Sequence, residues 1–337
     1  MIIPLGLEKD HLPQLPRIEF LVRSTEDPLE RDGQNVIAGL SERPKRISPV
    51  YVYDKRGTGL FERQCDTPEY YLRRAEAGLL ESHAADVLDI CGFIPIVELG
   101  AGTARKTRCL LAEFQKRGRR CDYYPIDIDT ETLLDAMAEL AEKFPRLFVH
   151  CLGATYERAL PLLSRCSQNR LFLFLGSSLG NMRLEELDSF LTLLSKSCAR
   201  GDFLLVGADL DKDAAMIDAA YNDAQGFGAE STLNMLHHLN RRYRGNFNVS
   251  RFRYRSRYNP SVRCNEVRIE SLVAQSVSLA SLQFTTEFSA GELIDAEIMW
   301  KFDPDELTER CRPFRFAPVQ RWIDPVHRYG LFLLRRH

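Results

Sequence analysis

The segment that most constrains the fold of this chain is an apolar run that ends in a glycine-rich turn. The run occupies residues 93–97, and Glu98-Leu99-Gly100-Ala101-Gly102 follows it. A short apolar run of this kind is typical of a central parallel strand. Gly100 and Gly102 let the backbone turn sharply and approach a ligand where a Cβ atom would block it. The pattern predicts a strand, a ligand-binding turn and a helix that begins near Arg105.

An acidic residue closes the next apolar run and indicates the kind of ligand. Asp127 follows residues 123–126, and its carboxylate can accept hydrogen bonds from both hydroxyls of a ribose. A nicotinamide fingerprint would place a glycine where Arg105 stands and the acid about 20 residues beyond the glycines. Asp127 comes later, and Glu98 suits a cationic ligand better than a pyrophosphate. These features favour S-adenosylmethionine over a nicotinamide cofactor, and a turn without a ligand is the remaining alternative.

Strand-like and helix-like runs alternate along the middle of the chain, which predicts an α/β fold with a mainly parallel, doubly wound sheet. The expected strands are residues 93–99, 123–128, 147–152, 171–175 and 203–206. The expected helices begin at residue 105 or span residues 131–143, 157–163 and 184–198. After residue 209 the rhythm changes, with helices expected at 214–224 and 232–240 and strands at 267–272, 277–282 and 329–334.

Composition excludes several classes of protein. The chain has 337 residues and a formal net charge of −2, which gives no reason to expect nucleic acid or an anionic membrane as a partner. The nine cysteines show no metal-binding spacing, and no metal is expected. With an odd cysteine count and no secretory signal, a reduced cytoplasmic protein is expected. No apolar run approaches the roughly 18 residues that a membrane span needs.

Several motifs occur in a fixed order along the chain. They are Tyr53-Asp54-Lys55-Arg56-Gly57, Pro68-Glu69-Tyr70-Tyr71, the glycine turn, Phe174-Leu175-Gly176-Ser177-Ser178-Leu179-Gly180-Asn181, Gly207-Ala208-Asp209-Leu210-Asp211-Lys212-Asp213, Ala220-Tyr221-Asn222-Asp223 and Glu297-Ile298-Met299-Trp300-Lys301-Phe302. Together they resemble the histidine-specific methyltransferase family of ergothioneine biosynthesis, whose members trimethylate the α-amino group of L-histidine.

The resemblance implies a Rossmann-like class I methyltransferase domain with a second, substrate-binding domain. It places an irregular arm at residues 1–30, the helical part of the substrate-binding domain at 31–85, the S-adenosylmethionine-binding domain at 86–211, an insertion that completes the substrate-binding domain at 212–302, and strands that return to the sheet at 303–337. A monomer is expected.

The resemblance also implies roles for individual residues. The cofactor would contact Glu98, Gly100, Gly102, Lys106, Asp127, Thr155 and Tyr156. Asn181 and Tyr221 would be the catalytic residues, which hold the α-amino and α-carboxylate groups of the substrate. The substrate pocket would also contain Tyr53, Tyr70, Gly176, Val267, Met299 and Glu297, the last of which would accept a hydrogen bond from the substrate's ring.

The chain departs from the family pattern at three positions and in one helix segment, which is rich in asparagine in the family and reads Ser231-Thr232-Leu233-Asn234 here. Met299 stands where the family carries a serine, Val267 where it carries a methionine, and Thr155 where it carries an aspartate. An apolar thioether cannot replace a hydroxyl, and an unpaired buried ring nitrogen costs about 1–3 kcal/mol. The primary prediction is α-N-methylation of L-histidine. Tryptophan, tyrosine or a derivative as the acceptor, and a non-catalytic S-adenosylmethionine-binding protein, remain the alternatives.

Overall fold

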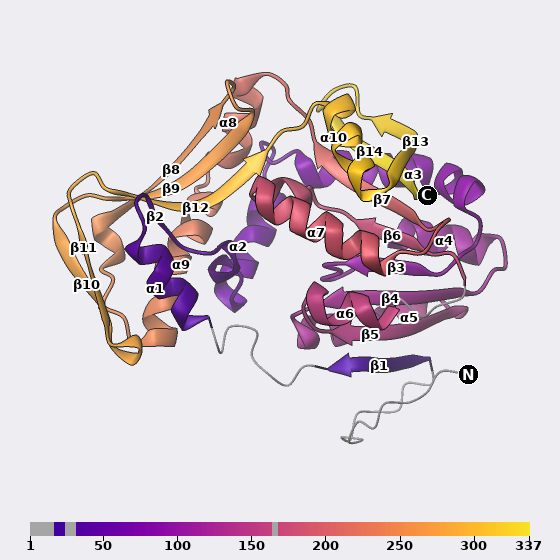
Figure 1. Cartoon of the computed structure of the whole chain (residues 1–337), viewed down its shortest axis with the longest axis horizontal. Helices are drawn as coiled ribbons and strands as arrows, with labels where there is room; N and C mark the ends of the chain where they lie inside the picture. The colour runs from indigo at the N-terminus through magenta and orange to yellow at the C-terminus, as the bar shows by residue number, and fades with distance from the viewer. Residues whose placement is uncertain (1–16, 24–31, 164–167) are drawn as a thin grey trace.

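The computed structural model describes residues 17–23, 32–163 and 168–337, which form two lobes joined side by side (Figure 1). The first lobe is built on an eight-stranded sheet with the order β1-β5-β4-β3-β6-β7-β14-β13. Its strands are β1 (Ile18–Arg23), β3 (Ile96–Leu99), β4 (Cys121–Asp127), β5 (Leu147–Gly153), β6 (Leu171–Phe174), β7 (Phe203–Asp209), β13 (Phe316–Ile323) and β14 (Tyr329–Arg336). All neighbours are parallel except β14, which runs antiparallel to β7 and β13.

Helices cover both faces of this sheet, as apolar strands with two buried faces require. Ile96 of β3 belongs to one core, and the next residue, Val97, belongs to the other. The first core is closed by helices α3 (Leu72–Cys91), α4 (Arg108–Lys116) and α5 (Thr130–Lys143). The second is closed by helices α6 (Tyr156–Leu163), α7 (Leu184–Ser197) and α10 (Pro304–Cys311). The predicted fold class, a doubly wound α/β sheet, is therefore confirmed.

The second lobe combines an early and a late part of the chain. Its four-stranded sheet has the order β2-β12-β9-β8, with β2 (Lys45–Arg46), β8 (Phe252–Asn259), β9 (Cys264–Ser271) and β12 (Leu293–Trp300). The early segment contributes helices α1 (Gly33–Ser41) and α2 (Lys55–Cys65), and the late one contributes α8 (Ala214–Tyr221), α9 (Phe227–Tyr243) and the hairpin of β10 (Gln275–Leu279) and β11 (Phe284–Phe288). Pairing of β2 with β12 and packing of α2 on α9 join the two segments.

Several predicted boundaries are corrected by local backbone geometry. The helix expected from residue 105 begins at Arg108, because the turn continues through Ala104, whose φ of 48° is left-handed. The helix expected at 232–240 already begins at Phe227, where the Asp223 carboxylate accepts hydrogen bonds from the first backbone amides. Helix α8 ends at Tyr221, earlier than the expected residue 224.

The arm expected to be irregular at residues 1–30 contains strand β1, which pairs with β5. The rest of that arm, residues 1–16 and 24–30, lies outside the described residues. Within the ranges that the structure describes, no helix combines the length and the hydropathy needed to cross a membrane.

Candidate active site

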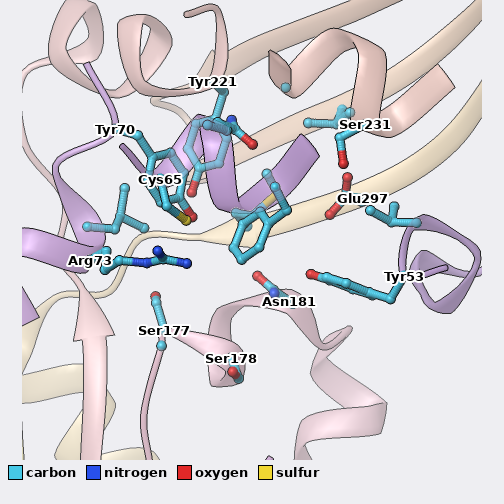
Figure 2. A pocket seen from close by; sticks show the side chains of 18 of the residues that line it. Tyr53, Cys65, Tyr70, Arg73, Ser177, Ser178, Asn181, Tyr221, Ser231 and Glu297 are labelled. Atoms are coloured by element: carbon cyan, nitrogen blue, oxygen red, sulfur yellow. The ribbon is translucent and has the colours of Figure 1, made fainter. Parts of the chain in front are cut away.

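A large cavity opens between the two lobes, at the carboxyl ends of the central parallel strands (Figure 2). It encloses about 1150 Å³ of space, part of which is open to solvent. The structure brings many of the predicted site residues into its wall: Tyr53, Tyr70, Gly100, Lys106, Gly176, Asn181, Tyr221, Val267, Glu297 and Met299. Ligands of open α/β sheets bind at this edge, so the cavity is the candidate active site.

The remaining predicted residues lie beside this cavity. Glu98 lines an adjoining pocket together with Gly100 and Lys106. Asp127 ends strand β4, and its carboxylate accepts hydrogen bonds from the Gly102 amide at 2.8 Å and the Asp129 amide at 3.0 Å. Burial raises the pKa of this carboxyl group. Each carboxylate oxygen has a further lone pair, so Asp127 keeps the capacity to accept two more hydrogen bonds.

Thr155 and Tyr156 lie at the start of helix α6 and do not line the main cavity. The Tyr156 hydroxyl comes within 3.0 Å of the position that a Cβ atom on Gly100 would take. Gly100 itself has a φ of 70°, which side chains rarely adopt. Tyr156 therefore lies close to Gly100, which lines the cavity.

Glu76 is a buried acid of the cavity wall to which sequence reasoning gave no role. It is 1% exposed and accepts hydrogen bonds from Lys106 Nζ, from the Gly176 amide at 2.7 Å and from the Tyr329 hydroxyl at 2.7 Å. It belongs to the apolar face of α3, with Leu72 and Leu79 as neighbours on that face. A charged residue on an otherwise apolar helix face is the signal that could have revealed it.

Two further acids differ from ordinary carboxylates. Glu98 is 4% exposed and accepts hydrogen bonds from the hydroxyls of Thr107, at 2.6 Å, and Tyr123. Glu297 faces the cavity, and its one side-chain hydrogen bond comes from Thr232 at 3.5 Å. Burial raises the pKa of each glutamate to about 7. A cation or a hydrogen-bond donor brought by a ligand would therefore stabilise the ionised form of either acid.

Aromatic side chains form a continuous row along the cavity. Tyr53 meets Phe61, Phe61 meets Tyr70, and Tyr70 meets Tyr221, each pair edge to face with ring centroids 6.0, 6.0 and 6.2 Å apart. Tyr53 is 48% exposed, which places it at the mouth, whereas Tyr70 and Tyr221 are buried. Tyrosines offer hydroxyl groups without adding charge, and their ring faces attract cations.

Strands β9 and β12 form the part of the cavity wall that contains Glu297. Val267 on β9 lies opposite Glu297 on β12, and Met299 follows two residues later on the same face of β12. Val267 is 1% exposed and Met299 is 8% exposed. The Glu297 carboxyl group therefore has apolar side chains beside it on the sheet and the Thr232 hydroxyl as a polar neighbour.

A family model described as histidine-specific, S-adenosylmethionine-dependent methyltransferase matches residues 32–336. The chain belongs to this family. It is 33% identical over 300 residues to the histidine N-alpha-methyltransferase of Mycobacterium tuberculosis, covering 89% of this chain and 93% of the relative. It is 32% identical over 313 residues to the protein of the same name from Mycolicibacterium smegmatis, covering 93% and 96%.

Among solved structures, this methyltransferase is similar in fold to the 1,6-didemethyltoxoflavin-N1-methyltransferase of Burkholderia thailandensis. That likeness covers 83% of this chain and 88% of the other, with 12% identity and a TM-score of 0.40. Family membership confirms the predicted enzyme class and the predicted cofactor, S-adenosylmethionine. In the described part of the methyltransferase, no cluster of three His, Cys, Asp or Glu side chains has the arrangement of a metal site.

The residues of this methyltransferase fit that cofactor. Gly176 has a φ of 83°, which side chains rarely adopt, and a Cβ atom there would come within 3.0 Å of Lys106 Nζ. Lys106 is a cation suited to a carboxylate, and the buried acid Glu98 is suited to an ammonium or sulfonium group. Asp127 retains acceptor capacity for ribose hydroxyls.

The raised pKa of Glu297 makes the stability of the ligand-free enzyme depend on pH. Burial raises this pKa from 4.5 to about 7, so the folded state binds the proton more tightly than the unfolded state. The resulting stabilisation is complete below about pH 4.5 and is lost as the pH rises through about 7, with a size on the order of 3 kcal/mol. Glu297→Gln cannot titrate, and we expect it to raise the melting temperature relative to wild type at about pH 8. A difference in melting temperature between the two proteins that stays constant from acid to alkaline pH would contradict this.

Proposed function

We propose that this enzyme transfers methyl groups from S-adenosylmethionine to the α-amino nitrogen of L-histidine. The observation that carries the proposal is the placement of Glu297. A half-buried carboxyl group, which accepts a long hydrogen bond of 3.5 Å from Thr232, faces a cavity that also contains Asn181 and Tyr221. A ring N–H of the substrate would satisfy that acid, and a charge-assisted hydrogen bond of this kind contributes about 1.5–3 kcal/mol. The family and the two mycobacterial relatives are named for the same acceptor.

In this proposal the side chains act mainly by alignment. The bound cofactor supplies an electrophilic methyl group, and charge disperses rather than accumulates as it is transferred, so positioning of a neutral amine dominates. The Asn181 amide can accept from the amine, and the Tyr221 hydroxyl can donate to the α-carboxylate. Tyr70 closes the same end of the cavity, and its ring face tolerates the growing positive charge of a methylated amine.

For the cofactor we propose contacts with Glu98, Gly100, Gly102, Lys106, Asp127, Thr155 and Tyr156. Hydrogen bonding of Gly102 to Asp127 and the approach of Tyr156 to Gly100 support this assignment. A threonine hydroxyl at position 155 can still accept a hydrogen bond from the amino group of adenine, without the charge of an aspartate.

A second candidate acceptor is favoured by the apolar lining. Val267 and Met299 flank Glu297 with side chains that offer no hydroxyl group. An indole has one N–H donor and a large apolar surface, so tryptophan, or tyrosine or a derivative, would also find partners here. We place histidine first, because its imidazole can share the proton of Glu297, whose pKa lies near 7.

A competition assay decides between these acceptors. Wild-type enzyme is incubated with S-adenosylmethionine and the twenty amino acids together, and new methylated species are identified by mass spectrometry. Methylation of histidine ahead of all others is the expected result. Turnover of tryptophan or tyrosine with none of histidine would replace the primary proposal by the second. Binding of S-adenosylmethionine without any methylated product would instead favour a binding protein that has lost turnover.

The remaining proposals concern organisation. We propose residues 31–85 and 212–302 as the substrate-binding part, 86–211 as the cofactor-binding part and 303–337 as strands added to its sheet, after an arm at 1–30. Pairing of β2 with β12, and of β14 with β7, supports this division. We propose a cytoplasmic monomer that acts on a free amino acid and has no nucleic-acid partner, which the near-neutral charge and the free thiols support.

A further inference from the structure

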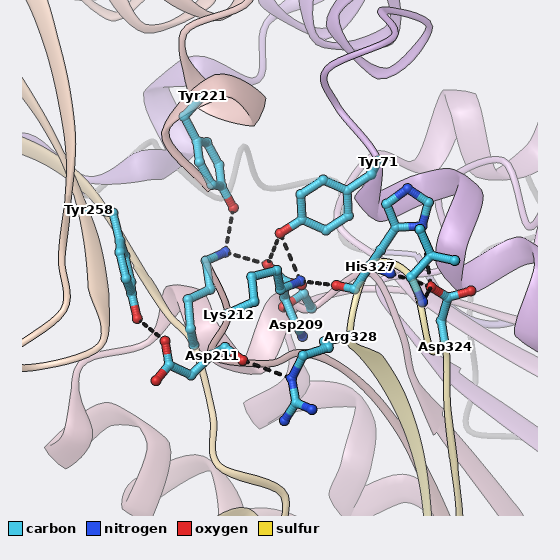
Figure 3. A network of polar contacts seen from close by, with 12 residues as sticks. Tyr71, Asp209, Asp211, Lys212, Tyr221, Tyr258, Asp324, His327 and Arg328 are labelled. Carbon is cyan, nitrogen blue, oxygen red and sulfur yellow. Dashed lines mark hydrogen bonds and ion pairs between the residues drawn. The ribbon is translucent and has the colours of Figure 1, made fainter. Parts of the chain in front are cut away.

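Behind the Tyr221 hydroxyl, on the side away from the cavity, lies a buried network of charged groups (Figure 3). Asp209, at the end of β7, is fully buried, and the side chains of Lys301 and Lys212 are 1% and 3% exposed. Lys301 Nζ lies 2.9 Å from the Asp209 carboxylate and 2.8 Å from the Tyr221 hydroxyl oxygen. Lys212 bonds the other carboxylate oxygen.

The network determines which way the Tyr221 hydroxyl is directed. An ammonium group has no lone pair, so Lys301 must donate and the Tyr221 oxygen must accept. The Tyr221 hydrogen is then left to donate elsewhere, and Tyr221 lines the cavity. Tyr71 provides the contrast, because its hydroxyl donates to Asp209 at 2.7 Å and accepts from Lys212 at 2.9 Å. The Tyr71 hydroxyl thus donates its hydrogen bond inside the network, whereas the Tyr221 hydroxyl is left to donate into the cavity.

The cations of the network lie beside several carboxylates. Two buried ammonium groups, Lys301 and Lys212, share the single carboxylate of Asp209. The neighbouring acid, Asp211, accepts from the Tyr258 hydroxyl, and its backbone carbonyl accepts from Arg328, which adds a further cation nearby.

We infer that Lys301 is a positioning residue that directs the Tyr221 hydroxyl, as a hydrogen-bond donor, toward the α-carboxylate of the substrate. The network therefore makes the enzyme specific for free amino acids and against amines or amides that share the same ring. This inference rests on the proposed function, since it requires an amino acid in the cavity.

The test compares two substrates that differ at the carboxylate alone, L-histidine and L-histidinamide. Lys301→Met keeps an unbranched side chain that ends one atom earlier, and removes the ammonium group with its charge and donors. We expect this variant to raise the KM for histidine about tenfold to a hundredfold, which corresponds to the loss of one hydrogen bond to a charged group. The change in kcat is expected to be smaller, and KM for histidinamide is expected to stay near the wild-type value. Calorimetric binding of both compounds in the presence of S-adenosylhomocysteine should show the same loss of discrimination.

Two further variants separate this role from a structural one. Lys45→Met removes another fully buried ammonium, which pairs with Glu292 at 2.8 Å in the second lobe and does not line the cavity. It should lower stability without changing the preference for histidine over histidinamide. Tyr221→Phe leaves the Lys301–Asp209 pair in place and should lose the same preference. In the Tyr221→Phe background, Lys301→Met should add little.

An unchanged preference in both Lys301→Met and Tyr221→Phe would overturn the inference while leaving the proposed function intact. If Lys301→Met does not fold, Lys301→Gln replaces it in the test, because its amide oxygen can accept the Tyr221 proton and so turn the hydroxyl away from the cavity. Additive losses in the double variant would show that Lys301 acts independently of Tyr221 and would also contradict the inference. Wild-type enzyme that binds no amino acid would overturn the proposed function and this inference together.

Discussion

Asp127→Ala is expected to weaken the binding of S-adenosylhomocysteine by about a hundredfold or more. The carboxylate already accepts the Gly102 and Asp129 amides, so the variant loses both the predicted ribose hydrogen bonds and the support of the glycine turn. Each hydrogen bond to a charged acceptor contributes about 1.5–3 kcal/mol, so two of them account for an effect of this size. Isothermal titration calorimetry with S-adenosylhomocysteine measures it directly.

Asp129→Ala is the matched control for this prediction. Asp129 lies two residues further on, is exposed, and caps helix α5 by accepting the Thr132 amide at 3.0 Å. Its loss should cost about 1 kcal/mol of stability, as the removal of an N-cap does, with little change in affinity for the cofactor product. Equal losses of affinity in Asp127→Ala and Asp129→Ala would mean that Asp127 acts through the loop and not through the ribose.

Glu297→Ala is expected to remove most of the preference for substrates with a ring N–H group. In wild type the acid faces the cavity with a single long hydrogen bond from Thr232, so it is free to accept from a substrate ring. The ratio of kcat/KM for histidine to that for phenylalanine should fall by about tenfold to a hundredfold, which corresponds to one charge-assisted hydrogen bond. The fall should come from histidine, with phenylalanine little affected.

Met299→Leu is the control for the ring end of the cavity. It lies on the same face of β12 as Glu297, and a leucine conserves its volume and apolar character. The ratio of histidine to phenylalanine turnover should stay within a few-fold of wild type. A ratio that Glu297→Ala leaves unchanged, or that Met299→Leu changes as much, would remove Glu297 from the role of ring acceptor.

The central strands were predictable because their physical environment is uniform. β3 and β6 are buried on both faces, so they are continuous apolar runs with turn signals at their ends. β13 escaped prediction because it is an edge strand with exposed residues along its middle and Pro318 within it. β8 was missed for a similar reason, since arginines alternate along the exposed face of an edge strand.

The candidate site was predictable where motifs are local and not where it depends on long-range contacts. The glycine turn and Asp127 meet across adjacent strands, as their spacing predicted. Glu76 and Gly176 lie 100 residues apart, and Lys301 and Tyr221 lie 80 apart, yet each pair shares a hydrogen bond. No pattern in the sequence orients such pairs toward each other. Their roles follow from the way the second lobe folds over the sheet.

Val267 and Met299 stand where the family carries other residues, and their effect on the choice of substrate stays a prediction. Val267 and Met299 lie in the cavity wall beside Glu297, as expected for residues that contact the substrate ring. A buried methylene contributes about 0.8 kcal/mol, whereas a charge-assisted hydrogen bond contributes about 1.5–3 kcal/mol. A single well-placed N–H donor therefore outweighs one or two extra apolar contacts, which is the physical reason for placing histidine and tryptophan ahead of rings without an N–H donor.

Nuclear magnetic resonance of the product tests the proposed reaction most directly. Wild-type enzyme is incubated with L-histidine and S-adenosylmethionine that carries an isotopically labelled methyl group, and the labelled signal is assigned to a nitrogen of the product. We expect the label on the α-nitrogen, with the imidazole unmodified. A label on a ring nitrogen, or histidine recovered without label from enzyme that binds the cofactor, would contradict the assignment of this cavity to α-N-methylation of histidine.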